Sequence, residues 1–115
     1  MQTAIGQAEA AISSARTYLF DAVGNVWRAA CDGEDDLSRK IVQARLAVTH
    51  ACRESVRAVD LLFEAAGTTA VYRSHPIERF YRDAHIAAKH WGGNSSNIDM
   101  AGQALLGLKP AGPGW

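Results

Sequence analysis

The residues that could most readily bind a metal or take part in catalysis lie in the segment RFYRDAHIAAKHWGGN, residues 79–94. It contains an Arg–Asp pair and two histidines, His85 and His90, on what we expect to be one helix. Imidazoles can bind a metal or exchange protons near neutral pH. Two helical ligands of one metal usually stand three or four residues apart, whereas these two point about 140° away from each other around a helix. We therefore predict no metal site.

His90 by itself has two interpretations. At the end of a helix, a histidine most often interacts with the last carbonyl groups and the negative end of the helix dipole. The alternative is that His90 lies at the edge of a pocket. Gly67, which precedes Thr68 and Thr69, most simply ends a helix. There is no Ser/His/Asp spacing and no phosphate-binding loop, so the residues alone indicate an all-α packing module.

Long helices must position these residues. The first is expected over roughly residues 3–30, where apolar residues alternate three and four apart, with large residues on one row and alanine on the other: Ile5, Ala8, Ile12, Ala15, Leu19, Ala22, Val26 and Ala29. The second, about 36–67, repeats the pattern with Leu37, Ile41, Ala44, Val48, Ala51, Ser55, Val59, Leu62 and Ala66. It should dock antiparallel on the first. Helices of ~45 Å exceed a small domain, so part of their surface should meet other subunits or another domain.

The connections between helices also have recognisable signals. Gly33 is expected to end the first helix, and Asp35 or Asp36 to cap the second. The third helix should run over about 76–91, with Ser74 as its cap and Pro76 in its first turn. A short last helix, IDMAGQALLGL, and a flexible tail, 108–115, complete the chain. The predicted fold is a single all-α domain, 1–115, an up-down bundle of three long helices plus a short C-terminal helix.

Composition excludes several classes of partner. Twelve basic and twelve acidic residues give no net charge, and no basic cluster suggests nucleic acid or a polybasic membrane anchor. No stretch is long and apolar enough for a membrane span, and no signal peptide is evident, so we expect a cytoplasmic protein. Cys31 and Cys52 lie in separate predicted helices and are interpreted as small buried residues without a disulfide.

Almost the whole chain resembles a known family. LFEAAGTTAVYRSHPIERFYRDAHIAAKHW, followed by DMAGQALLGLKP, is similar to the C-terminal helical domain of the acyl-CoA dehydrogenase superfamily, and more closely to its two-component flavin-dependent monooxygenases. The resemblance rests on the order of a glycine-containing turn, an aromatic residue, a proline, an Arg, an Arg–Asp pair, a histidine and a small-residue helix. Here these are Gly67, Tyr72, Pro76, Arg79, Arg82, Asp83, His90 and residues 101–107.

Two departures argue against a dehydrogenase. Trp91 stands where many acyl-CoA dehydrogenases have the glutamate that abstracts the substrate proton, and an indole cannot act as a general base. The glycine-rich turn of the family near the flavin retains Gly67 but has Thr68 and Ala70 at its later glycine positions. The resemblance therefore favours the monooxygenase branch.

The resemblance implies a site and its partners. His90 would be the catalytic residue beside the flavin and a small aromatic substrate, and Gly67, Thr68, Thr69 and Trp91 would form the pocket wall. Arg79, Arg82 and Asp83 would be structural supports that hold the turn, while His85 would face another direction. Reduced flavin, FADH2 or FMNH2, would come from a separate reductase, and the protein would be a homodimer or homotetramer.

Members of the family carry an N-terminal helical domain and a central β-domain before these helices, and neither is present in this sequence. We therefore expect the 115-residue chain alone to bind flavin weakly. Two alternatives remain open at this point. One is a non-catalytic assembly or binding module, and the other is an acyl-CoA dehydrogenase-like oxidoreductase whose base lies elsewhere.

Overall fold

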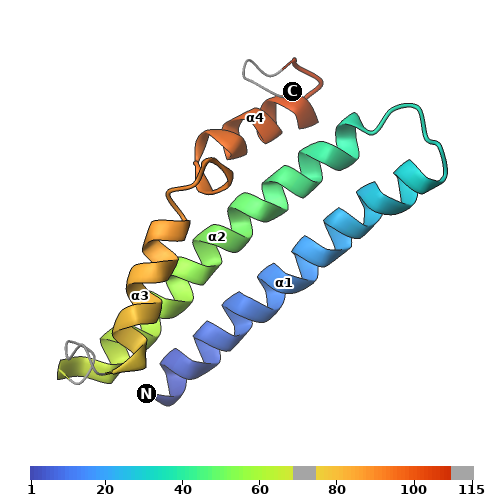
Figure 1. Ribbon diagram of the computed structural model, residues 1–115. Helices are drawn as coiled ribbons and strands as arrows, with labels where there is room; N and C mark the ends of the chain where they lie inside the picture. Colours follow the sequence, from blue (N-terminus) through green and yellow to red (C-terminus); the bar gives the residue numbers. More distant parts are fainter. Residues whose placement is uncertain (69–74, 110–115) are drawn as a thin grey trace.

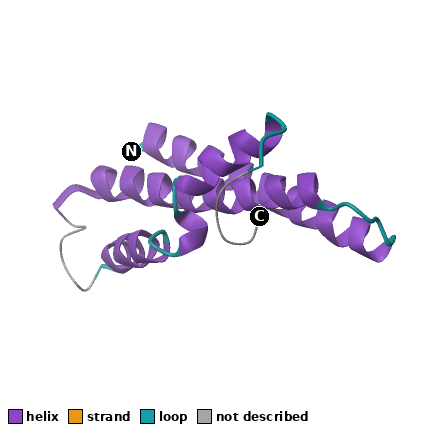
Figure 2. Ribbon diagram, turned by 90° about the horizontal axis from the view of Figure 1, so that it is seen from above, coloured by secondary structure: helices purple, strands orange, loops and turns teal. Residues whose placement is uncertain are grey.

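Two long antiparallel helices form the body of the molecule. The structure, a computed structural model, describes residues 1–68 and 75–109. In it, α1 (Gln2–Cys31) and α2 (Ser38–Ala66) lie side by side as a hairpin, and α3 (Pro76–Ala87) and α4 (Ser96–Leu105) follow on the other side of α2 (Figure 1). The described residues contain no strand (Figure 2). The all-α class and the antiparallel docking of the first two helices are confirmed.

Alanine makes the contact between α1 and α2. The buried residues of α1 are all alanines, Ala8, Ala11, Ala15, Ala22 and Ala29, and four of them belong to the predicted alanine row. The larger residues of the other row are only partly buried, and Ile5 is 52% exposed. The prediction for α2 holds in part: its buried residues, Val42, Ala47, Thr49 and Ala58, lie outside the predicted row, but Leu62 of that row packs against the cluster of Ala8, Ala11 and Ala58. Toward the start of α2, three residues of the predicted row, Ile41, Ala44 and Val48, line a groove.

The loop between α1 and α2 largely has the conformation that its sequence predicts. Gly33 adopts a φ of 71°, in the left-handed region that glycine tolerates, and its N–H bonds to the carbonyl of Ala30. A carboxylate oxygen of Asp36 accepts a bond from the amide of Ser38 at 2.9 Å. Hydrogen bonds from the Ser38 side chain and backbone lower the pKa of Asp36, with a smaller contribution from Lys40. Asp36 thus satisfies an amide of the first turn of α2, although the residue at the cap position is Leu37.

The third helix begins at Pro76 as predicted, but its cap and its end differ from the prediction. His75 is the residue at its N-cap, and the Nδ1 atom of its ring accepts a bond from the amide of Ile77; Ser74, the predicted cap, lies outside the described residues. Pro76 occupies the first turn as expected. The helix ends at Ala87, four residues early, and a short 3-10 turn, η2 (Trp91–Gly93), connects it to α4. The third long helix is therefore a short helix of 12 residues.

The described part of the chain has a thin core. Its buried hydrophobic residues are eight alanines and Val42, whereas large side chains such as Phe20, Trp27 and Leu106 are more than 70% exposed. Cys31 is exposed and Cys52 partly exposed, both as free thiols, so the prediction of buried cysteines was wrong. No helix in the described ranges is long and apolar enough to cross a membrane. The predicted tail, 108–115, falls mostly outside the described residues.

Candidate functional site

His90 begins the 3-10 turn and does not end a helix. It is the N-cap of η2, and its Nδ1 atom accepts a bond from the amide of Gly92 at 3.3 Å. Its ring therefore caps the amide end of the next element, so the interpretation as a helix-end residue that meets the last carbonyls was wrong. Since α3 has already ended at Ala87, the expectation of one helix carrying both His85 and His90 was wrong as well.

Two buried polar side chains bond to this turn. The hydroxyl of Thr49, in α2, donates to the carbonyl of Gly92 at 2.6 Å. The amide nitrogen of Asn97, in α4, donates to the carbonyls of Trp91 at 2.7 Å and Gly92 at 3.4 Å. Thr49 is 0% and Asn97 3% exposed, the only buried polar residues in the described ranges. Sequence reasoning missed both, because a threonine within a helix and an asparagine near a helix start have commonplace explanations.

The glycines after Trp91 allow close approach of the backbone. A Cβ atom on Gly93 would lie 2.3 Å from the carbonyl oxygen of Ala88, which is backbone and cannot rotate away. A Cβ atom on Gly92 would lie 3.2 Å from a methyl group of Val48. The repeated glycine was visible in the sequence, but its reason is the fold of the turn against α2 and the end of α3.

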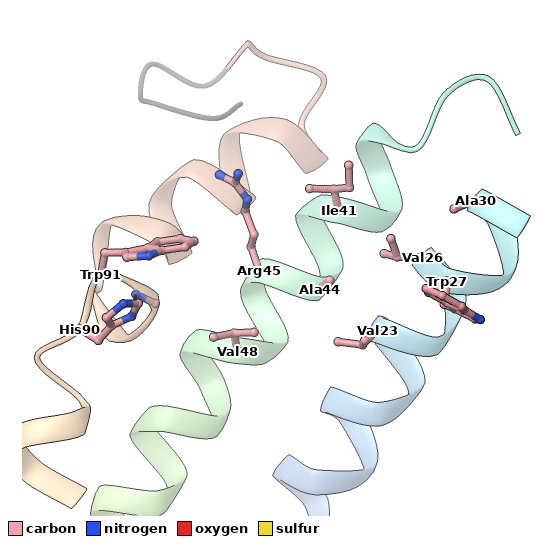
Figure 3. A pocket seen from close by; sticks show the side chains of 11 residues that line it. Val23, Val26, Trp27, Ala30, Ile41, Ala44, Arg45, Val48, His90 and Trp91 are labelled. Atoms are coloured by element: carbon pink, nitrogen blue, oxygen red, sulfur yellow. Dashed lines mark hydrogen bonds between the residues drawn. The ribbon is translucent and has the colours of Figure 1, made fainter. Parts of the chain in front are cut away.

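An apolar groove opens beside the turn. It has a volume of about 430 Å³. One long side is formed by α1, the floor by α2 and the opposite side by the turn (Figure 3). Its lining residues are Val23, Val26, Trp27, Ala30, Ile41, Ala44, Arg45, Val48, His90, Trp91 and Gly92. The guanidinium of Arg45 lies 5.8 Å from the centre of the Trp91 ring, and the rings of His90 and Trp91 are also 5.8 Å apart. The groove can accept a flat apolar molecule beside one imidazole and one guanidinium.

The other predicted wall residues lie elsewhere. Gly67 ends α2 with a φ of 62°, and Thr68 follows it, at the end of α2 farthest from the α1–α2 loop (Figure 1). The length of α3, roughly 18 Å for a helix of this size, separates them from His90. Thr69 falls outside the described residues. The structure thus brings together His90 and Trp91, and within this chain it leaves Gly67 and Thr68 apart from them.

The predicted supports form ion pairs along α3. Arg82 bonds to Glu78 at 2.8 Å and Arg79 to Asp83 at 3.6 Å, four residues apart in each case. The side chains of Arg79, Arg82 and Asp83 are at least 60% exposed, so these pairs stabilise α3 only slightly. Their role in holding the turn stays a prediction.

His85 has a structural contact that its sequence position did not reveal. Its Nε2 atom lies 2.7 Å from a carboxylate oxygen of Asp60, which joins α3 to α2. The ring of Tyr81 lies 4.4 Å from that of His85 and 4.3 Å from that of Phe63. Because α3 has no buried residue, this cluster is a main attachment of the helix. Across residues 1–68 and 75–109, no group of His, Cys, Asp and Glu could hold a metal ion.

Comparison with known proteins identifies the family. Residues 1–95 match the family described as acyl-CoA dehydrogenase, C-terminal domain. The chain belongs to this family. It is 31% identical over 114 residues to the indole-3-acetate monooxygenase of Acinetobacter baumannii, a match that covers 99% of the chain and 29% of the relative.

Two other relatives are named as flavin-dependent. The flavin-dependent monooxygenase, oxygenase subunit HsaA, of Mycobacterium tuberculosis is 33% identical over 75% of the chain and 22% of its own length. The FADH(2)-dependent resorcinol hydroxylase, oxygenase component, of Rhizobium sp. is 37% identical over 50% of the chain and 14% of its own length. The chain thus spans less than a third of the curated relatives that it matches. The expected family and its flavin-dependent monooxygenase relatives are confirmed.

The groove fits part of a flavin site. Its aliphatic and indole side chains suit one face of a flat ring system, and its imidazole offers a hydrogen-bonding group at the edge. The lining has one cation, Arg45, and no glycine-rich phosphate loop, so these residues would contact a ring rather than a nucleotide phosphate.

Proposed function

We propose that this chain is the C-terminal helical domain of the oxygenase component of a two-component flavin-dependent monooxygenase that hydroxylates an aromatic or related ring compound. The observation that carries the proposal is the meeting of His90 and Trp91 in one apolar groove, in a chain whose relatives are named as monooxygenases. Trp91 in place of a carboxylate leaves this part of the groove without the base that a dehydrogenase needs.

The side chains of the groove have distinct roles in this proposal. Val23, Val26 and Val48 present an apolar surface to the reacting ring, and once the rest of the oxygenase covers the groove this surface excludes water, which strengthens every polar interaction in the site. Trp91, with the guanidinium of Arg45 near its ring, offers a flat wall for an aromatic molecule. His90 supplies the titratable hydrogen-bonding group. Reduced flavin, FADH2 or FMNH2, supplies the activation of O2 when it is bound.

The proposal includes partners. A separate reductase delivers the reduced flavin, in keeping with the names of relatives as an oxygenase subunit and an oxygenase component. The exposed apolar side chains of α1, Phe20 and Trp27, support contact with further protein, either the other domains of an oxygenase or a second copy in a homodimer or homotetramer. The predicted cytoplasmic location is part of the same proposal.

The test of this function uses the oxygenase polypeptide that contains the chain. It is combined with a flavin reductase, NADH, FAD or FMN, and a panel of indoles and phenols. We expect hydroxylated product to form with reduced flavin and O2, and none to form when O2 is omitted. Oxidation of acyl-CoA substrates with an electron acceptor, in the absence of ring hydroxylation, would replace this proposal with the dehydrogenase alternative.

The isolated chain should bind flavin weakly. The groove is open, and it offers only one wall to the ring. Fluorescence titration should give a dissociation constant above ~1 μM for oxidised and reduced FMN and FAD. Tighter binding would mean that the 115 residues already contain a complete flavin site.

A further inference from the structure

Two successive peptide units of the turn are fixed from outside it. The carbonyl of Trp91 and the N–H of Gly92 belong to one planar peptide unit, and Asn97 donates to that carbonyl at 2.7 Å. The next unit contains the carbonyl of Gly92, which accepts from Thr49 at 2.6 Å, and the N–H of Gly93, which bonds to the carbonyl of His90 at 2.8 Å. The carbonyl of Trp91 also accepts a bond from the amide of Asn94 at 3.1 Å, so the orientation of the Gly92 N–H depends on this local bond together with the bonds from α2 and α4.

This orientation determines which nitrogen of His90 carries the proton. The N–H of Gly92 points at Nδ1 of His90, which accepts the bond and must be unprotonated. A neutral imidazole has one N–H and one acceptor nitrogen, so its proton lies on Nε2. Nε2 has no hydrogen bond to any residue within the described ranges 1–68 and 75–109, and the ring lines the groove. The neutral side chain therefore offers a donor to a molecule in the groove.

We propose that Thr49 and Asn97 are positioning residues that hold neutral His90 as an Nε2–H donor toward the groove. The group that it meets there is a hydrogen-bond acceptor, an oxygen or unprotonated nitrogen of the bound ring compound or cofactor. His90 in this state gives a proton or a hydrogen bond and does not abstract a proton. That the acceptor belongs to a reacting molecule rests on the proposed function, whereas the protonated nitrogen and its dependence on Thr49 do not.

A purely structural role for Thr49 predicts something different. Buried polar groups are nearly always paired, so the Thr49 bond could serve only to satisfy the Gly92 carbonyl. In that case its loss would lower stability and leave the state of the His90 ring unchanged. The position of the imidazole proton is therefore the measurement that separates the two roles.

The experiment is nitrogen NMR of the histidine rings in the ¹⁵N-labelled chain at alkaline pH, with the His90 signals assigned by their loss in His90→Gln. In the wild-type chain we expect a protonated Nε2 and an unprotonated Nδ1. In Thr49→Val, which removes the donor and keeps a similar shape, the ratio of Nε2–H to Nδ1–H rings should fall by about fivefold, the factor that one hydrogen bond of about 1 kcal/mol supplies. Thr49→Ser retains the hydroxyl and should restore the ratio.

Two further variants make the test specific. Asn97→Leu removes the bond to the Trp91 carbonyl and should shift the ratio in the same direction. Ser14→Ala is the matched control, because Ser14 also donates to a backbone carbonyl, that of Ala11, but far from the turn. It should leave the His90 ring signals unchanged.

Several outcomes would overturn the proposal. A wild-type ring protonated on Nδ1 refutes it without any variant, so the test does not depend on whether Thr49→Val folds. Unchanged His90 signals in a folded Thr49→Val chain would reduce Thr49 to a structural residue. The measurement uses no flavin: if the ring behaves as expected while the oxygenase forms no hydroxylated product, the proposed function fails and the positioning of His90 stands.

Discussion

The two sides of α2 are held by different kinds of contact. On one side, α1 packs through alanines that allow the helix backbones to approach closely. On the other side, α3, the turn and α4 are attached by directional polar contacts, from Thr49 to Gly92, from Asn97 to Trp91 and from His85 to Asp60. Within α3, the turn and α4, the buried residues are few, namely Gly92, Asn97 and Ala101.

The two kinds of contact fix different features of the molecule. Apolar packing fixes the distance between two helices but tolerates small rotations of side chains, whereas a buried hydrogen bond fixes the direction of a single atom. The α1–α2 hairpin therefore sets the width of the groove, and the polar contacts set the orientation of His90. Changes on the two sides should affect different measurements.

The largest expected effect is on chemistry. His90→Ala in the complete oxygenase should lower the rate of hydroxylation or the yield of hydroxylated product by about 10²-fold, the usual scale for the loss of a positioned acid or base. Helical content should barely change, because the ring is exposed and caps only one short turn. The yield of product per NADH and rapid-mixing kinetics provide the measurement.

Lys89→Ala is the control for His90, because Lys89 is its exposed neighbour. His85, which the resemblance places facing another direction, is unsuitable as a control, since its loss would remove the contact between α3 and Asp60. Equal and small effects of His90→Ala and Lys89→Ala would leave His90 as a capping residue and remove the catalytic support for the proposed function in this chain.

Gly93→Ala should disrupt the turn that connects α3 to α4, because of a steric conflict. The new methyl group would meet the backbone of Ala88, and we expect a loss of stability at the upper end of about 1–3 kcal/mol in urea unfolding. Gly102→Ala is the matched control in α4, where a Cβ atom meets nothing within 4 Å. It should stabilise the chain by about 0.5–1 kcal/mol. Equal effects of both glycine substitutions would contradict the role assigned to the turn.

On the apolar side, Ala15→Leu should overfill the contact between the helices. Ala15 is 3% exposed, and extra methyl groups there should cost about 1–3 kcal/mol of unfolding free energy. Ala44→Leu, on the groove floor, should cost less and occupy part of the cavity. Thermal unfolding compares the two variants; a larger loss for Ala44→Leu would mean that the helices meet on a different face.

The smallest expected effect belongs to the attachment of α3. His85→Ala removes a partly exposed contact with Asp60 and a ring contact with Tyr81, which together should contribute about 1 kcal/mol. Hydrogen exchange should show faster opening of α3 and an unchanged α1–α2 hairpin. An equal increase of the hydrogen-exchange rate in all helices would show that the contacts on the two sides of α2 do not open independently.

Periodicity predicts the hairpin well because its signal is local. The alanine row from Ala8 to Ala29 and the glycine at position 33 can be identified without any tertiary information. The end of α3 could not be predicted in this way, because Ala88, Lys89 and His90 all suit a helix and no signal ends it at Ala87.

The site depends on residues that are distant in the sequence. The turn is fixed by Thr49, 43 residues before Gly92, and this pairing exists only once α2 and the turn are packed together. Spacing therefore identified His90 and Trp91 as candidates, with the help of the family resemblance, but could not show which nitrogen of the imidazole would be held. The separation of Gly67 from His90 also follows from the length of α3 and not from a local motif.

The alanine row has a consequence for the geometry of the hairpin. Ala8, Ala15, Ala22 and Ala29 recur every seven residues, whereas two turns of a straight α-helix take about 7.2 residues, a mismatch of about 20° per repeat. Over three repeats, a straight α1 would turn its row by about 60° relative to α2, and a seven-residue repeat of this kind is the pattern that favours a left-handed winding of two packed helices. One residue inserted into α1 would rotate every later alanine by about 100°, which makes the length of this helix as strictly constrained as its composition.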